Sequence, residues 1–247
     1  MPFTAAEVER YARQLVLKEI GGQGQQALKA ARVLIVGVGG LSAPAALYLA
    51  ASGVGRIGLV DADEVALSNL QRQVLFATDD VGRPKTTAAT EHLKALNPHV
   101  DIVAHPLVLN ADNAASLIAG YDLVLDGTDD FGARFAVNAA CVALGKPLVS
   151  GAIGRWTGQV GLFEGRPCYR CLVPESPPDA ETCAVVGVVG ALAGVIGSFM
   201  AMEAVKQITG AGHTLAGRLL VYDGLSGDVR VSRIGADPHC PVCGGNT

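Results

Sequence analysis

A glycine-rich turn between two apolar runs constrains the fold more than any other feature of the sequence. The run Arg32–Val36 has the length and branched side chains of a buried strand, and it leads directly into the turn Gly37–Ser42. The alanine-rich run Ala43–Ser52 then has the character of a helix, and Arg56–Val60 that of a second strand. This order predicts a βαβ unit with two parallel strands.

The alternation continues along the chain and predicts an α/β fold. We expect a helix from Ala5 to about Glu19, opened by the capping-box pattern Thr4-x-x-Glu7 and broken at Gly21-Gly22. Further helices are expected at Gln25–Ala30, Lys85–Leu96, Ala111–Ala119 and Phe131–Leu144, and further strands at Asp101–Ala104, Leu123–Leu125 and Pro147–Ser150. Such alternation implies a Rossmann-like, mostly parallel sheet with helices on both faces.

The pattern changes after Gly151. The segments Thr157–Phe163 and Leu219–Arg233 look like antiparallel strands placed around one long helix. We therefore expect a single domain over residues 1–247, in which a nucleotide-binding half (residues 1–150) is followed by a half (residues 151–247) that extends the sheet.

The composition excludes some classes of partner. The chain of 247 residues carries a net charge of −4, so it has no basic stripe that would neutralise nucleic-acid phosphates. The segment Cys183–Met202 runs 20 residues without a charge, which is about the length that spans a bilayer. Its four glycines and the lack of an aromatic belt favour a buried helix instead, at the core or at a subunit interface, with Gly190 and Gly194 suited to close packing.

The glycine-rich turn is also a candidate phosphate site. A turn of the form Gly37-x-Gly39-Gly40 between a strand and a helix brings backbone N–H groups and a positive helix end close to phosphates. Asp61 ends the second strand 24 residues after Gly37, where Rossmann proteins place an acidic residue on the ribose. We expect an adenine nucleotide here, with a purely structural turn as the alternative because Ser42 replaces the third glycine of the usual fingerprint.

The residues that follow Asp61 favour ATP over NAD. Asn69 and Arg72 lie just beyond the strand tip, and Lys85 opens the next helix. Cations at this edge would neutralise a triphosphate and stabilise the charge that develops in nucleotidyl transfer. The segment Asp126–Asp130 follows another strand, where a carboxylate can hold Mg²⁺ against the phosphates.

Two Cys-x-x-Cys pairs predict a metal site. Cys168 and Cys171 are separated by 68 residues from Cys240 and Cys243. Two such pairs complete the tetrahedral four-sulfur shell that Zn²⁺ prefers, and a closed shell of this kind is structural. Disulfides or a redox motif are the alternatives. The polar N-terminal segment does not resemble a signal peptide, so we expect a reducing cytoplasm, where paired cysteines more often bind metal.

Together these motifs resemble those of the MoeB/ThiF/HesA family, bacterial relatives of the adenylating domain of ubiquitin-activating enzymes. The resemblance runs from Arg10-Tyr11-Ala12-Arg13-Gln14 to the last cysteine pair and includes the glycine turn, the Asp61–Gln73 signature, Lys85, the Asp-Gly-Thr-Asp segment and both cysteine pairs. It implies a homodimer that uses Mg-ATP to adenylate the C-terminal glycine of a small ubiquitin-like sulfur carrier ending in Gly-Gly. Residues 151–247 would then bind the carrier.

The resemblance also implies roles for individual residues. Matched by motif, the phosphates would be contacted by Gly39 and Gly40, the ribose by Asp61, the triphosphate by Asn69, Arg72 and Lys85, and Mg²⁺ by Asp129. Arg13 corresponds to a residue that reaches into the ATP site of the neighbouring subunit. Asp130 stands where the family usually has asparagine, and this departure leaves the effect on nucleotide or metal affinity open.

Several alternatives remain at this point. The carrier could belong to molybdopterin or to thiamine synthesis, and no residue decides between them. An NAD-dependent oxidoreductase and a non-enzymatic scaffold are more remote, since neither explains Arg72, Lys85 and Asp129 together. Cys141 is expected to be a core residue, and Cys183, which would be catalytic only in the thiamine branch, is expected to be dispensable for adenylation.

Overall fold

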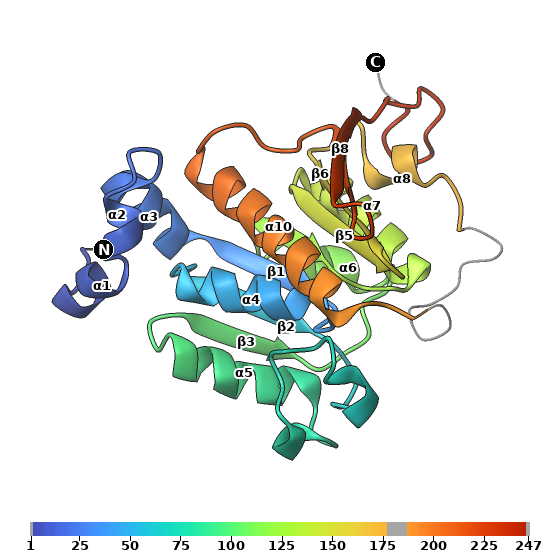
Figure 1. Cartoon of the computed structure of the whole chain (residues 1–247). Coiled ribbons are helices and arrows are strands. Elements are labelled where there is room, and N and C mark those ends of the chain that lie inside the picture. The colour runs from blue at the N-terminus through green and yellow to red at the C-terminus, as the bar shows by residue number, and fades with distance from the viewer. Residues whose placement is uncertain (1, 177–186, 246–247) are drawn as a thin grey trace.

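The computed structural model describes residues 2–176 and 187–245 and contains an eight-stranded sheet (Figure 1). The strand order across the sheet is β3-β2-β1-β4-β5-β6-β7-β8. The strands are β1 (Arg32–Val36), β2 (Arg56–Val60), β3 (Asp101–His105), β4 (Leu123–Asp126), β5 (Leu148–Gly154), β6 (Thr157–Phe163), β7 (Arg218–Asp223) and β8 (Asp228–Arg233). The first five pair in parallel and the last three antiparallel, so the predicted fold class is confirmed.

Helices cover both faces of the sheet (Figure 1). The α-helices are α1 (Ala5–Arg10), α2 (Ala12–Leu15), α3 (Gly21–Ala30), α4 (Ser42–Ala51), α5 (Lys85–Leu96), α6 (Ala114–Ile118), α7 (Phe131–Leu144), α8 (Tyr169–Leu172) and α10 (Gly190–Thr209), and two 3₁₀ turns are η1 (Leu67–Asn69) and η2 (Thr78–Asp80). Side chains of α3, α4, α5 and α10 enter one hydrophobic core, and those of α6, α7 and α8 enter a second.

The central strand β1 explains how both cores form. Its residues Val33 and Ile35 belong to the first core, and Leu34 and Val36 belong to the second. Because successive side chains of a strand point to opposite faces, a strand that is covered on both sides must be apolar throughout. The run that predicted β1 from sequence is therefore apolar for a tertiary reason.

The N-terminal segment differs from the predicted helix. Thr4 and Glu7 form the capping box as expected, and an ion pair with Lys29 together with the amide of Thr4 lowers the pKa of Glu7 to about 2. The helix is nevertheless broken into α1 and α2 and ends at Leu15. The glycines Gly21 and Gly22 begin α3 instead of separating two helices, because Gly21 adopts a positive φ of 55° that redirects the chain at the helix start.

The long apolar helix is shifted along the sequence relative to its prediction. It starts at Gly190 and continues beyond Met202 to Thr209, because Glu203 and Lys206, one turn apart, form an ion pair and do not interrupt it. Cys183 and the other residues predicted before Gly187 lie outside the described residues. By length and composition α10 could cross a membrane, but it packs against α4, β5 and β6 as a core helix.

Close packing of α10 depends on one of the two glycines that we expected, Gly190, and on Gly197 in place of Gly194. A Cβ at Gly197 would lie 2.3 Å from the carbonyl oxygen of Leu41, and one at Gly190 would lie 2.1 Å from that of Gln71. A Cβ at Gly194 would meet no atom within 4 Å. Gly197 and Gly190, rather than Gly194, therefore let α10 approach the glycine-rich turn at Leu41 and the loop after η1 at Gln71.

Strand lengths in the second half of the sheet also differ from the prediction. The strand expected at Pro147–Ser150 extends to Gly154 as β5, because its end pairs antiparallel with β6 as far as Gly154 and Thr157. The segment Leu219–Arg233 is a hairpin of β7 and β8. The helix expected at Ala111–Ala119 is limited to α6.

Candidate functional site

A pocket of about 650 Å³ lies at the carboxyl ends of β1, β2 and β4. The chain leaves β1 toward β2 on one side and later returns to form β4 on the other side, so the strand order reverses at this point. Open α/β sheets bind their ligands in the crevice outside such a reversal. The fold therefore places a ligand site where the sequence predicts the nucleotide.

The glycine-rich turn forms the floor of the pocket. Gly37 has a positive φ of 78°, and a Cβ there would lie 2.8 Å from Cγ2 of Thr128, so only glycine fits. Gly39 and Gly40 line the pocket beside the start of α4. No side chain caps α4. The N–H of Ala43 donates to the carbonyl oxygen of Gly39 and Pro44 has no N–H, so a phosphate would meet the N–H groups of the turn that precede Ala43.

Asp61 connects the tip of β2 to the glycine-rich turn. One oxygen of its carboxylate accepts a hydrogen bond from the backbone N–H of Val38 at 2.7 Å, and the other accepts one from Asp63 at 2.8 Å. The ammonium of Lys85 lies 2.8 Å from the Asp63 carboxylate and 3.7 Å from that of Asp61. Lys85 is buried at the start of α5, so its charge is held inside the pocket.

Asn69 and Arg72 form a second polar group on the same side. The guanidinium of Arg72 donates to the Asn69 side-chain oxygen at 2.9 Å. The stem of Arg72 lies over Gly40, where an added Cβ would come within 3.3 Å of Cγ. Arg72 therefore lies directly above the glycine-rich turn.

The loop after β4 carries three aspartates with different surroundings. Asp126 is buried and accepts hydrogen bonds from Thr128 and Ser150. Asp130 caps α7 by accepting from the N–H of Ala133 at 2.7 Å. Asp129 is exposed at the pocket, and among the described residues no hydrogen bond or ion pair engages its carboxylate. Asp129 is thus the carboxylate of this loop that remains available to a cation.

The capping contact gives the unusual Asp130 a structural explanation. Aspartate and asparagine are about equally good N-cap residues, so either can fill this position. The negative charge of Asp130 is also favourable beside the positive end of α7.

Arg134 is a buried cation at the pocket that was not predicted from the sequence. Its guanidinium donates to the carbonyl oxygens of Thr128 and Gly151 and to the hydroxyl of Tyr169. Burial opposes its charge, but the nearby Asp126 and Tyr169 hold the pKa of Arg134 above its ordinary value. Its three partners come from separate segments, so Arg134 fixes the loop that carries Asp129. The available signal was a single charged residue within a largely apolar helix.

Two further groups of residues that line the pocket were not predicted as site residues. Leu107, Val108, Leu109 and Phe131 form an apolar wall suited to a nucleobase. On the polar side, the buried Gln73 has its side-chain nitrogen near Gly39. Gln73 is visible in the sequence as the end of the Asp61 signature, whereas the apolar wall belongs to a loop without a regular pattern.

Arg13 is the one predicted site residue that does not line the pocket. It is exposed on α2, and in Figure 1 α2 lies with α1 and α3 at the amino end of β1. The pocket lies at the carboxyl end of the same strand. Within one chain, therefore, the structure brings together Gly37, Gly39, Gly40, Asp61, Asn69, Arg72, Lys85 and Asp129, but not Arg13.

The four paired cysteines meet in one cluster. Cys168 and Cys171, at α8, have their sulfur atoms 3.6 and 3.4 Å from those of Cys240 and Cys243, respectively, and all four sulfurs lie within 4.8 Å of one another. A tetrahedral zinc site with Zn–S bonds of about 2.3 Å requires sulfurs about 3.8 Å apart. A disulfide would require about 2.05 Å. The donor set fits Zn²⁺.

The surroundings of the cluster agree with a closed site. The backbone N–H of Asp237 and the side-chain amide of Asn138 point at the sulfurs of Cys171 and Cys168, each at 3.5 Å. His239 is exposed and is not part of the cluster. Cys141 is buried elsewhere, in the core below α7, where burial raises the pKa of its thiol to about 12. Its predicted core position is confirmed.

Comparison with known proteins identifies similar sequences over nearly the whole chain. Residues 11–242 match the model of the ThiF family. The chain is 49% identical over 253 residues to a sulfur carrier protein adenylyltransferase of Thermus thermophilus, covering 99% of this chain and 93% of that protein. It is 49% identical over 243 residues to a probable adenylyltransferase/sulfurtransferase, MoeZ, of Mycobacterium tuberculosis, and 46% identical over 245 residues to an adenylyltransferase and sulfurtransferase, MOCS3, of Aedes aegypti.

These relatives differ in length. The matches cover 95% and 97% of this chain but 62% of MoeZ and 56% of MOCS3, so the chain spans a little over half of these longer proteins. Solved structures share the fold. The crystal structure of E. coli MccB with ATP matches with a TM-score of 0.80 at 25% identity, covering 90% of this chain and 70% of that one. PaaA matches with a TM-score of 0.81 at 25% identity, covering 94% and 75%.

Proposed function

Because the chain belongs to the ThiF family and matches an adenylyltransferase over nearly its full length, it is an adenylyltransferase, and we propose that it adenylates a small ubiquitin-like sulfur carrier. The proposed substrate group is the C-terminal glycine carboxylate of a carrier that ends in Gly-Gly. The carrier we propose is the one of molybdenum cofactor biosynthesis. The thiamine-pathway carrier is the competing assignment.

One observation carries the proposal. Two cations, Lys85 and Arg72, stand around an uncapped helix start and a glycine-rich turn, and an apolar wall completes the pocket. Such a pocket suits a nucleotide whose base lies on the apolar wall and whose phosphates lie at the turn. The match to MccB in a structure with ATP supports this choice of nucleotide.

The proposed reaction needs charge cancellation more than proton transfer. A terminal carboxylate has a pKa of roughly 3.3–3.7, so it is ionised at neutral pH and needs no general base. One of its oxygens bonds to the α-phosphorus of ATP while the bond from that phosphorus to the α–β bridging oxygen breaks. Pyrophosphate leaves with the electron pair. Two anions must meet for this step, so the main barrier is electrostatic.

The cations of the pocket are arranged to lower that barrier. Lys85 already pairs with the exposed carboxylate of Asp63. A phosphate would replace that carboxylate as the partner of Lys85, and the ammonium would remain buried and paired throughout. Arg72, above Gly40, would contact the α- and β-phosphates and stabilise the negative charge that develops on the leaving pyrophosphate. Asp129 is the residue that would hold Mg²⁺, which supplies further positive charge to the phosphates when bound.

The cysteine cluster would serve the carrier-binding half in a structural role. Its ligands join α8 to residues that follow β8, and a four-sulfur shell leaves no open position for substrate or water. Asn138 of α7 donates to Cys168 and accepts from the N–H of Tyr169, so the cluster is coupled to the helix that supports the Asp129 loop.

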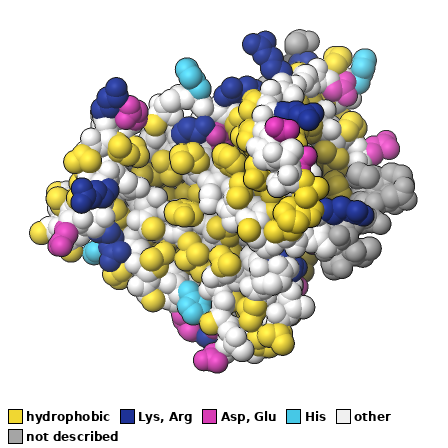
Figure 2. Space-filling view, in the orientation of Figure 1, with side chains coloured by type: hydrophobic (Ala, Val, Ile, Leu, Met, Phe, Trp, Pro, Cys, Tyr) yellow, Lys and Arg dark blue, Asp and Glu magenta, His cyan; other side chains and the backbone are white. Residues whose placement is uncertain are grey.

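We propose that Arg13 acts in the pocket of a second copy. Figure 2 shows hydrophobic side chains over the face made by α4 and α10. Tyr48 of α4 and Met202 of α10 are each more than half exposed. An apolar face of this kind supports a homodimer.

The test of the shared pocket is to mix the variants Arg13→Ala and Lys85→Ala. If each pocket combines Lys85 of one chain with Arg13 of the other, the mixed dimer has one intact pocket. Activity should then return to about a quarter of the wild-type level at equal mixing. No recovery after subunit exchange would contradict the shared pocket.

Pyrophosphate–ATP exchange tests the main proposal. Purified chain is incubated with labelled pyrophosphate, ATP and either the molybdopterin or the thiamine carrier, each also prepared without its last glycine as a control. Exchange with the intact molybdopterin carrier alone is expected. Exchange with the thiamine carrier alone would move the assignment to that pathway, and exchange with neither would overturn it.

Cys183 would have a catalytic role only in the thiamine branch. It lies outside the described residues, and we propose that it has no part in adenylation. Cys183→Ala should therefore leave the exchange rate unchanged. A loss of exchange in this variant would contradict the proposal. We also propose that the reaction takes place in the cytoplasm, where the cysteine cluster would remain reduced.

A further inference from the structure

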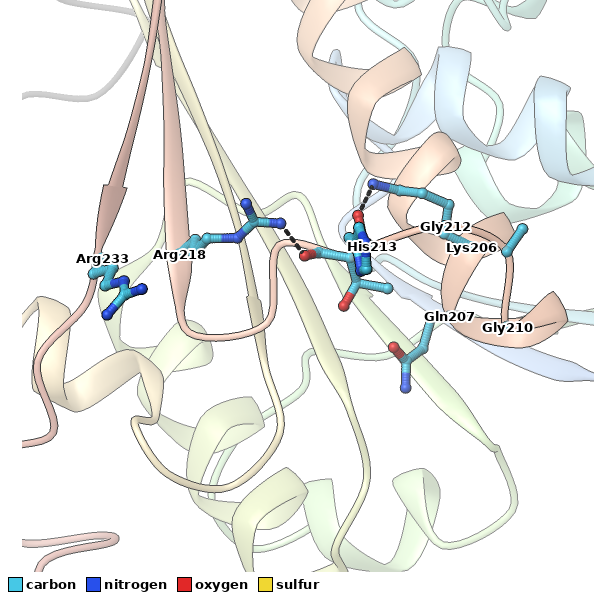
Figure 3. Close-up of a pocket in the computed structure, with 9 residues that line it drawn as sticks. Lys206, Gln207, Gly210, Gly212, His213, Arg218 and Arg233 are labelled. Atoms are coloured by element: carbon cyan, nitrogen blue, oxygen red, sulfur yellow. Dashed lines mark hydrogen bonds between the residues drawn. The ribbon is translucent and has the colours of Figure 1, made fainter. Parts of the chain in front are cut away.

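A second cavity, of about 730 Å³, lies at the far end of α10 from the nucleotide pocket. Figure 3 shows how its walls are built. Lys206 and Gln207 come from the last turns of α10, Arg218 from the start of β7 and Arg233 from the end of β8, with the loop 210–214 between them. The cavity shares no lining residue with the nucleotide pocket.

The two arginines stand opposite each other. Arg218 and Arg233 are direct partners in the antiparallel register of β7 and β8, so their side chains leave the same face of the sheet. Like charges at such positions destabilise a strand pair unless an anion lies between them. Among the described residues, neither arginine forms an ion pair with an acidic side chain.

One further cation lines the cavity, and one carboxylate lies near it. Lys206 forms an ion pair with Glu203 and donates to the carbonyl oxygen of His213 at 2.9 Å. The nearby Glu164 accepts a hydrogen bond from Gln207 at 2.7 Å. The cavity lining itself contains no aspartate or glutamate. The excess positive charge in the wall therefore resides on the two arginines.

Their hydrogen-bond donors are also largely unused. A guanidinium has five N–H donors. Arg218 directs one of them to the carbonyl oxygen of Thr214, and the guanidinium of Arg233 makes no hydrogen bond to another described residue. Both line the cavity, so charged donors from two adjacent strands are available within its wall.

From this arrangement we propose that the cavity binds a phosphate-class oxyanion, such as inorganic phosphate, pyrophosphate or the phosphate group of a small molecule. Paired arginines match the oxygens of such a group in charge and geometry. The lining has no large apolar or aromatic side chain apart from the ring of His213, so it offers no wall for a nucleobase or a lipid. The site is independent of the function proposed above.

Thermal unfolding with increasing inorganic phosphate, at constant ionic strength maintained with chloride, tests the site. A ligand that binds the folded state raises Tm in a saturable manner. Arg233→Ala should weaken the apparent affinity of this cavity for phosphate about tenfold or more. The affinity of the nucleotide pocket for phosphate should be unaffected. Without phosphate, the same variant should melt no lower than the wild type, because it removes a repulsive pair.

A matched control lies on the same strand. Arg230 is exposed on β8, and since it is three positions from Arg233 its side chain leaves the opposite face of the sheet. Arg230→Ala should keep the wild-type response to phosphate. The proposal would be overturned if Arg233→Ala and Arg230→Ala responded equally to phosphate. It would also be overturned if Arg233→Ala did not reduce the phosphate response of the wild type. Pyrophosphate and acetate form the other arms, and acetate binding as tightly as phosphate would overturn the phosphate class.

Discussion

The nucleotide pocket and the cysteine cluster each gather side chains from distant segments, but they differ in how these side chains are paired. In the cluster the four sulfurs face one another, and nothing in the shell is left for a further ligand once a metal is bound. In the pocket several polar groups can still bind a ligand. No side chain caps the start of α4, no described residue engages the carboxylate of Asp129, and Lys85 pairs with an exposed carboxylate. One site is closed for stability, and the other is arranged for exchange of ligands.

The largest effect should come from opening the cluster. In Cys240→Ser one thiolate ligand is lost, and loss of a structural metal belongs to the group of changes that cost about 4 kcal/mol or more of unfolding free energy. For a chain of this size we expect Tm to fall by about 10 °C. Zinc content by elemental analysis and calorimetry on the same sample are the measurements.

The matched control for the cluster is Cys141→Ser, which alters a buried cysteine that has no part in it. This variant should keep a full complement of zinc. If the exchange rate per folded molecule falls in Cys240→Ser at temperatures well below its Tm, the cluster has a role in catalysis and the comparison between the two sites fails.

Opening the pocket should give the reverse result, a large loss of activity with little loss of stability. Lys85→Ala removes the buried ammonium beside Asp61 and Asp63. Removal of one such charge-stabilising group costs about 10²–10³-fold in rate. Lys94→Ala, an exposed lysine on the same helix, is the control and should behave as wild type. Unchanged exchange kinetics in Lys85→Ala would remove this residue from the proposed site.

The difference between the two sites also explains what could be predicted from sequence. The cysteine pairs and the glycine turn are local patterns, and the reversal of strand order then brings Asp61, Arg72 and Asp129 to one edge whatever the details of packing. Strand β1 was predictable because it is covered on both faces and is therefore apolar from Val33 to Val36.

Features that depend on partners far away in the chain were not predictable. Arg134 lies in an apolar helix, and its role follows only from the carbonyl of Gly151 and the hydroxyl of Tyr169, which the fold brings to it. The end of α10 was misplaced because Glu203 and Lys206 neutralise each other within the helix. A charge that ends an apolar run in sequence need not end a helix when it is paired.

A finer comparison concerns the contact between the floor of the pocket and the loop that carries Asp129. A Cβ at Gly127 would lie 2.3 Å from Oγ of Ser42, a buried hydroxyl without a hydrogen bond to any described residue. The room for Ser42, where nucleotide-binding turns usually have glycine, is therefore provided by Gly127. Gly127→Ala should destabilise the protein by about 1–3 kcal/mol through overpacking.

The reciprocal change tests that explanation. Ser42→Ala removes the oxygen that the new Cβ would meet, so the double variant should recover most of the stability lost in Gly127→Ala. Ser42→Ala alone should be neutral or stabilising, because it removes a buried hydroxyl with no partner. Denaturant unfolding of all four proteins gives the coupling energy, which we expect to be about 1–2 kcal/mol. Additive effects would show that Ser42 and Gly127 do not press on each other.

The smallest expected effect distinguishes a structural aspartate from a ligand-binding one within a single loop. Asp130 caps α7, so Asp130→Ala should cost about 1 kcal/mol of unfolding free energy, whereas Asp130→Asn should cost almost nothing. Asp129→Asn should show the converse, with unchanged stability and a raised KM for ATP, because its carboxylate makes no contact that the fold requires. The readouts are Tm and exchange kinetics on each variant. If Asp130→Asn raises the KM for ATP as strongly as Asp129→Asn, both carboxylates face the nucleotide. Asp130 would then be a ligand-binding residue and not only the cap of α7.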